Sequence, residues 1–192
     1  MFKNKYMKNF SVVAVALILV LAGCISDEAN LELILDRDKQ AIETYLQENP
    51  IPSVKEFIDE PTGVRVIWQE LSESGIKPEI GDTLFVNYTG KLLNNNVFDT
   101  SIESVARENN RFNPNRDYEP IAVLFGYGQV ILGFEFALSI MEEGDKATTL
   151  FPSLYGYGSD DGRPDIPQNS PLLFELELVR VGKITSEEPE NI

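Results

Sequence analysis

Residues 81–90 read GDTLFVNYTG, and within them Leu84, Val86 and Tyr88 occupy alternate positions. A period of two is typical of a strand that packs one face on a core. The same alternation runs through residues 64–69 (VRVIWQ) and 172–179 (LLFELELV). These patterns predict several antiparallel strands in the region of about residues 63–182.

Helical spacing occurs in two places. Phe134, Leu138 and Met141 recur with it inside the strand-rich region, so we expect an α+β domain in which a sheet curls around one short helix. A second helix is predicted over residues 31–48, ending before the prolines at 50 and 52. Its expected apolar stripe consists of Leu31, Leu35, Ile42, Tyr45 and Leu46.

These patterns divide the chain into segments. Residues 24–61, including the polar-apolar stretch 53–59, are interpreted as a tether with one or two helices. The folded domain is expected over residues 62–183, and residues 184–192 form an acidic tail.

The composition excludes several classes of function. The chain has 192 residues and a net charge of −15, which argues against binding to nucleic acid, since phosphate recognition requires a basic surface. It has no histidine and one cysteine, so zinc sites, histidine-based catalytic triads and internal disulfides are excluded.

The N-terminus resembles a targeting signal. Lys3, Lys5 and Lys8 precede an apolar run over residues 12–22, which is shorter than the roughly 20 residues that span a bilayer. Residues 21–24, LAGC, then resemble the lipobox of bacterial lipoproteins. We therefore expect a signal peptide over residues 1–23 and lipidation of Cys24, which would anchor the chain to a membrane.

Other interpretations of this region stay open. The apolar run is alternatively a transmembrane anchor, and Cys24 a buried side chain. Residues 25–28, ISDE, resemble the surface-export signal of some Gram-negative lipoproteins, or they begin a solvated acidic tether. The expected location is the cell envelope, with the outer membrane favoured, on its periplasmic or surface face.

Seven sequence blocks follow one another between residues 81 and 178. They are residues 81–90, 97–101 (VFDTS), 128–134 (GQVILGF), 141–146 (MEEGDK), 155–158 (YGYG), 166–169 (IPQN) and 172–178 (LLFELEL). In residues and in order they resemble the FKBP-type peptidyl-prolyl cis-trans isomerases. The resemblance implies a five- or six-stranded antiparallel half-barrel around a short helix, with an apolar pocket between them and no cofactor or metal.

Isomerisation of an X-Pro bond suits this composition. The bond has a modest trans preference but interconverts slowly, because amide resonance must be broken. Catalysis requires tighter binding of the twisted amide than of either planar form, with no nucleophile, metal or proton donor. A dry pocket assists, because water stabilises the more polar planar amide.

The resemblance also implies roles for individual residues. Phe134 would form the floor of the pocket, and the Tyr157 hydroxyl and the Ile131 backbone N–H would bind substrate carbonyls. Asp99, held by Tyr88, would lie beside the rotating carbonyl. The remaining pocket residues would be Phe98, Ile121, Val130, Ile166 and Phe174. Alternatively the apolar members are ordinary core, although a carboxylate at position 99 is costly to bury unpaired.

The chain departs from the family pattern at several positions, including two in the pocket and one insertion. Phe134 stands where many members carry Trp, and Ile121 where an aromatic residue is common. An insertion, residues 102–119, contains Arg107, Arg111 and Arg116 together with Phe112 and Tyr118. We expect it to lie beside the pocket, either to help select the client or as a packed surface excursion.

The sequence therefore predicts a lipid-anchored prolyl isomerase that binds proline-containing unfolded or exported polypeptides. The alternatives are a non-catalytic module that binds a proline peptide, and a chaperone of the cell envelope that acts through its N-terminal segment.

Overall fold

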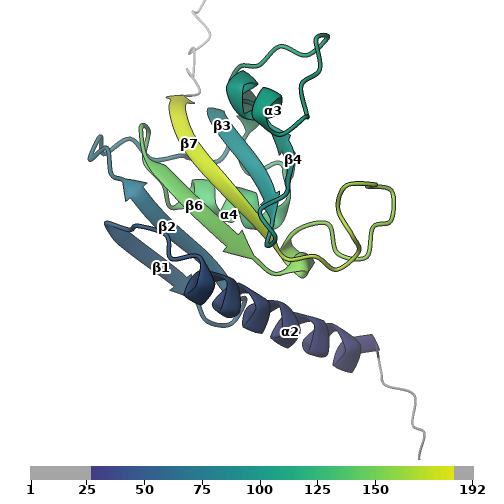
Figure 1. Ribbon diagram of the computed structural model, residues 1–192. Coiled ribbons are helices and arrows are strands. Elements are labelled where there is room, and N and C mark those ends of the chain that lie inside the picture. Colours follow the sequence, from purple (N-terminus) through teal and green to yellow (C-terminus); the bar gives the residue numbers. More distant parts are fainter. Residues whose placement is uncertain (1–26, 184–192) are drawn as a thin grey trace, which may run out of the picture. The chain divides into compact units, whose positions relative to one another are not determined.

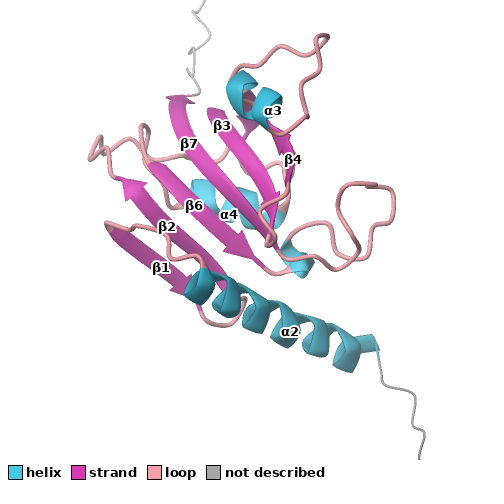
Figure 2. Cartoon of the chain, in the orientation of Figure 1, coloured by secondary structure: helices cyan, strands magenta, loops and turns pink. Residues whose placement is uncertain are grey.

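The computed structural model describes residues 27–183, and the chain divides into two compact units, Met1–Leu33 and Ile34–Ile192. Within the described residues the strands are β1 (Lys55–Asp59), β2 (Val64–Glu70), β3 (Thr83–Leu92), β4 (Val97–Thr100), β5 (Ile121–Leu124), β6 (Lys146–Phe151) and β7 (Leu172–Gly182). The helices are α2 (Asp27–Glu48), α3 (Glu103–Glu108) and α4 (Leu132–Ser139), with a 3-10 turn at Ser153–Tyr155. Figure 2 distinguishes the helices from the strands.

One antiparallel sheet contains all seven of these strands. Its order is β1-β2-β6-β7-β3-β4 (Figure 1), and β5 pairs with β3 beside β4. The predicted fold class is therefore confirmed: an antiparallel sheet with one short helix, α4, and a helical segment before it. The insertion connects β4 to β5 and contains the short helix α3.

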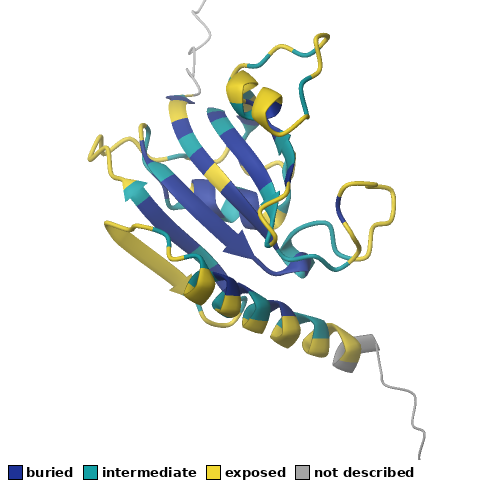
Figure 3. Cartoon of the chain, viewed as in Figure 1, coloured by how far each residue is buried: buried dark blue, intermediate teal, exposed yellow. Residues whose placement is uncertain are grey.

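The two faces of the sheet pack on different helices. The main core lies on the α4 face and includes Val66 and Trp68 of β2, both fully buried. Ile67, between them, points to the opposite face, where it packs with Ile42 and Tyr45 of α2. The alternation read from residues 64–69 is thus the alternation between two cores, and the central strands are largely buried (Figure 3).

Helix α2 confirms the helix predicted over residues 31–48, with differences in its buried side chains. Ile42 and Tyr45 are buried as expected, whereas Leu31 is 49% exposed, so the stripe was wrong at its first position. The pattern missed Asp38, which is fully buried. None of the helices in the described part of the chain combines the length and the apolarity needed to cross a membrane.

The interpretation of residues 53–59 as part of a helical segment was wrong, because Lys55–Asp59 form β1. Phe57 pairs with Val66 across the β1–β2 hairpin, and its ring lies 5.7 Å from that of Phe136 on α4. Gly63 closes the hairpin with a φ of 74° and donates its N–H to the Asp59 carbonyl. The sheet thus begins before residue 62 and has more than the five or six strands implied by the resemblance.

Candidate active site

A cavity of about 360 Å³ opens between β3, β4, the start of α4 and the segment after the 3-10 turn. Nine of the ten pocket residues expected from the sequence line it: Tyr88, Phe98, Asp99, Ile121, Val130, Ile131, Phe134, Tyr157 and Phe174. The structure therefore brings together residues that are up to 86 positions apart in the chain, from Tyr88 to Phe174.

Aromatic rings form the base of the cavity. Phe134 on α4 is 3% exposed, and its ring meets those of Phe174 and Tyr88 edge-on, with centroids 5.2 Å and 6.0 Å away. Phe98 meets Phe174 in the same way at 5.5 Å. Gly90 permits this packing, because a Cβ atom at its position would lie 2.5 Å from the Phe98 ring. The base of the cavity is therefore apolar and closely packed.

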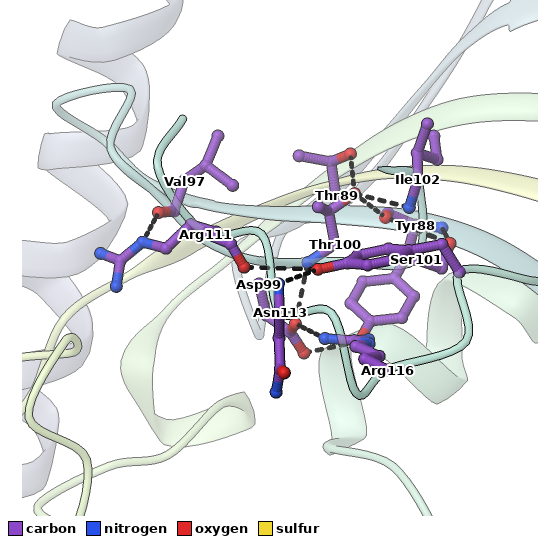
Figure 4. Close-up of polar contacts among 11 residues, drawn as sticks. Tyr88, Thr89, Val97, Asp99, Thr100, Ser101, Ile102, Arg111, Asn113 and Arg116 are labelled. Atoms are coloured by element: carbon purple, nitrogen blue, oxygen red, sulfur yellow. Dashed lines mark hydrogen bonds and ion pairs between the residues drawn. The ribbon is translucent and has the colours of Figure 1, made fainter. Parts of the chain in front are cut away.

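A carboxylate with fixed partners lies at the same cavity. The Tyr88 hydroxyl donates to Asp99 Oδ2 at 2.5 Å, and the Thr100 backbone N–H donates to Asp99 Oδ1 at 2.9 Å. Arg116 forms an ion pair with Asp99 Oδ1 and donates from Nη2 to the Tyr88 hydroxyl at 3.0 Å (Figure 4). The Asp99 side chain is nevertheless 43% exposed, so the carboxylate is oriented by the protein and accessible from the cavity.

These contacts also affect protonation. Burial raises the pKa of Tyr88 to about 12, and the hydrogen bond to Asp99 acts in the same direction. The pKa of Arg116 is raised, because its contacts with Asp99 and Tyr88 outweigh the opposing effect of burial. At neutral pH the Tyr88 hydroxyl therefore remains a hydrogen-bond donor to Asp99, and Arg116 keeps its charge.

Arg116 was not predicted as a site residue. In the sequence it is one of three arginines of the insertion, which was expected either to help select the client or to be a packed surface excursion. In the structure Arg111 also has a partner inside the protein, Asp165 at 2.9 Å, and Arg107 pairs with Glu103. The sequence marks Arg116 only as a basic residue in the connection between β4 and β5. Both of these strands pair with β3.

Tyr157 lines the other side of the cavity, beside a second residue that the sequence analysis missed. The Arg163 guanidinium lies 3.8 Å from the centroid of the Tyr157 ring, and both residues line the cavity. Burial raises the pKa of Tyr157, and the charge of Arg163 opposes the shift. The Tyr157 phenol is therefore neutral at physiological pH and able to donate a hydrogen bond.

Ile131 lies at the point where α4 begins. It is the N-cap residue, with extended dihedral angles, and its carbonyl accepts the N–H groups of Phe134 and Glu135. The N–H of an N-cap residue lies outside the helical hydrogen-bond ladder, which suits the expected contact with a substrate carbonyl.

One expected pocket residue lies elsewhere. Ile166 is 7% exposed and belongs to the main core, but it does not line the cavity. Its backbone N–H donates to the Arg163 carbonyl, so it supports the loop from which Arg163 reaches the pocket. Gly128 and Gln129 line the cavity as well and were not singled out. Within the described residues, no group of three or more Cys, Asp or Glu side chains is arranged to hold a metal ion.

Comparison with known proteins gives consistent matches. Residues 74–179 match the family described as FKBP-type peptidyl-prolyl cis-trans isomerase. A short-type peptidyl-prolyl cis-trans isomerase of Methanocaldococcus jannaschii is 45% identical over 83 residues, which are 43% of this chain and 52% of that protein. Human peptidyl-prolyl cis-trans isomerase FKBP2 is 36% identical over 110 residues, which are 57% of this chain and 68% of that protein. The chain thus spans about half the length of the archaeal relative.

Solved structures agree in fold. A peptidyl-prolyl cis-trans isomerase from Pseudomonas syringae superposes with a TM-score of 0.57 at 25% identity, covering 79% of this chain and 96% of that one. FkpA from Escherichia coli superposes with a TM-score of 0.56 at 23% identity, covering 95% of this chain and 74% of that one.

Proposed function

Because this chain belongs to the FKBP-type peptidyl-prolyl cis-trans isomerase family, we propose that it catalyses the cis–trans isomerisation of X-Pro bonds in polypeptides. The observation that supports this most strongly is the cavity lined by both Phe134 and Asp99. It combines an aromatic base, suited to a proline ring, with an oriented carboxylate that remains accessible.

The residues act by binding the twisted amide better than the planar one. The proline ring packs on Phe134, and the dry base removes the water that would stabilise the planar amide. The Ile131 N–H and the Tyr157 hydroxyl hold carbonyls of the substrate backbone, so that rotation is confined to one bond. Asp99, kept in place by Tyr88 and Arg116, supplies a fixed field beside the rotating carbonyl.

Cis–trans exchange of a short X-Pro peptide, followed by NMR, tests this proposal. The full chain accelerates the exchange, and a variant that carries Asp99→Ala and Tyr157→Phe loses the acceleration while its fold, checked by circular dichroism, is retained. A folded wild-type protein that binds the peptide without accelerating its exchange would instead be a proline-peptide binding module, which contradicts the proposal.

The clients are proposed to be exported polypeptides at the cell envelope, reached through a lipid anchor on Cys24. The support for this is the sequence of residues 1–24, a basic start and an apolar run that ends at LAGC. These residues lie outside the part of the chain that the structure describes. A lipidated Cys24 would hold an acidic protein at a membrane surface that otherwise repels it.

Membrane fractionation of the Cys24→Ser variant tests the anchor. The wild-type protein sediments with membranes and the variant is released into the soluble fraction. A variant that still sediments with membranes would overturn the lipoprotein interpretation without affecting the proposed activity.

A further inference from the structure

A second hollow lies on the α4 face, on the other side of the chain segment that borders the active-site cavity. It has a volume of about 420 Å³ and is lined mainly by apolar side chains, among them Ile80, Phe125, Leu132 and Phe136. Two of these are strongly exposed: Ile80 by 76% and Leu132 by 60%. We call this hollow the Ile80–Leu132 groove.

Three polar contacts at the edge of the groove are made within the protein. The Thr62 hydroxyl donates to Asp59 Oδ2, and the Ser139 hydroxyl donates to the Phe136 carbonyl at 2.6 Å. Glu135 Oε1 accepts the Gly126 N–H at 2.9 Å. A ligand in this groove therefore gains little from hydrogen bonds and much from burying apolar surface, which favours aliphatic or aromatic side chains.

The groove and the active-site cavity lie on either side of one short segment, which contributes residues to both. Within residues 126–134, Gly128, Gln129, Val130, Ile131 and Phe134 line the cavity, whereas Gly126, Leu132 and Gly133 line the groove. Tyr127 lies between Gly126 of the groove and Gly128 of the cavity and is 64% exposed. A polypeptide with its proline in the cavity thus has an apolar surface beside it that a tetrapeptide is too short to use fully.

We propose that the Ile80–Leu132 groove binds an apolar segment of the same unfolded polypeptide whose proline occupies the active-site cavity. This inference rests on the proposed isomerase function and extends it. It predicts that the enzyme prefers X-Pro bonds that lie near apolar side chains, as they do in chains that have not yet folded. The groove raises the affinity for long substrates without acting on the rotating bond.

The test compares two substrates on the full chain. One is a tetrapeptide, and the other is an unfolded protein whose refolding is limited by prolyl isomerisation. The groove variant carries Ile80→Ser and Leu132→Ser, which remove exposed apolar side chains at positions outside the active-site cavity. The matched control is Val54→Ser, which removes a side chain 64% exposed that lines neither hollow.

We expect the groove variant to keep the wild-type kcat/KM on the tetrapeptide and to lose about tenfold on the unfolded protein, whereas the control changes neither. Equal activity of all three proteins on the unfolded substrate would overturn the proposal. So would concentration-dependent dimerisation of the wild-type protein that the groove variant abolishes, because a second copy would then occupy the groove.

Binding is measured separately from turnover, with a labelled peptide that carries one proline and a cluster of leucines. If the wild-type protein binds this peptide about tenfold more tightly than the groove variant but does not isomerise it, the groove proposal stands and the proposed activity fails. If both proteins isomerise the tetrapeptide and bind the labelled peptide equally, the activity stands and the groove proposal fails.

Discussion

Asp99 and Asp38 each join segments that are distant in sequence, but in opposite surroundings. The Asp99 side chain is 43% exposed at the active-site cavity, and its partners include Tyr88 and Arg116. Asp38 on α2 is fully buried, and its Oδ2 accepts both the N–H and the hydroxyl of Ser153. An exposed carboxylate held in place remains available to a substrate, whereas a buried one with all its partners inside the protein holds the fold together.

The Asp38 contacts also bear on the site. Ser153 begins the 3-10 turn, and its carbonyl accepts the Gly158 N–H, which closes the segment that contains Tyr157. Arg37 pairs with Asp38 at 2.6 Å and donates to the Asn169 carbonyl on the far side of the same loop. Helix α2 therefore fixes both ends of the loop that brings Tyr157 and Arg163 to the cavity.

The largest expected effect is on stability, from Asp38→Ala. The change leaves the buried N–H and hydroxyl of Ser153 without acceptors, which costs about 3 kcal/mol of unfolding free energy. Urea unfolding of the full chain measures it. Asp38→Asn keeps an acceptor and loses less, and Asp36→Ala, at an exposed position of the same helix, is the control with almost no change. A loss below 1 kcal/mol for Asp38→Ala would show that Asp38 does not hold the loop.

The second prediction concerns the pH dependence of stability that Tyr88 contributes at the active-site cavity. The pKa of Tyr88 is about 12 in the folded protein and about 10 when the chain is unfolded, so the folded state holds the phenolic proton more tightly. The resulting stabilisation is fully present below pH 10 and is lost as the pH rises through 12. It amounts to about 2–3 kcal/mol.

Urea unfolding of the wild-type protein and of Tyr88→Phe, at pH 9 and at pH 11, measures this contribution. The wild-type protein loses more stability than the variant between these two values. Tyr45, on the α2 face, also has a pKa raised by burial, but it is present in both proteins and cancels in the comparison. Identical pH dependence of the two proteins would mean that Tyr88 titrates normally.

The same contrast explains which parts of the molecule the sequence predicts. The pocket residues lie in short blocks with alternating apolar positions, so local pattern and family resemblance together place nine of the ten. Asp38 contacts Ser153, which lies 115 positions away, and Arg116 contacts Asp99, 17 positions away. Strand β1 pairs with β2, about ten residues further along the chain. No local sequence pattern identifies these partners. An aspartate in a helix indicates an exposed face by default, and only the position of Ser153 makes Asp38 a buried residue. Ile166 was placed in the pocket by resemblance, whereas its side chain packs in the main core.

The smallest effect concerns Arg116, which acts through Asp99 and is therefore a positioning residue. Arg116→Gln removes the ion pair with Asp99 and leaves Tyr88 and Thr100 as hydrogen-bond donors to it. We expect kcat on an X-Pro tetrapeptide to fall roughly fivefold, equivalent to about 1 kcal/mol, with KM nearly unchanged, because the pocket surface stays intact. Arg107→Gln is the matched control, since the Arg107 side chain pairs with Glu103 and stacks on Phe112, both within the insertion. A rise in KM without a fall in kcat would instead assign Arg116 to substrate binding, and its effect would then belong with client selection by the insertion.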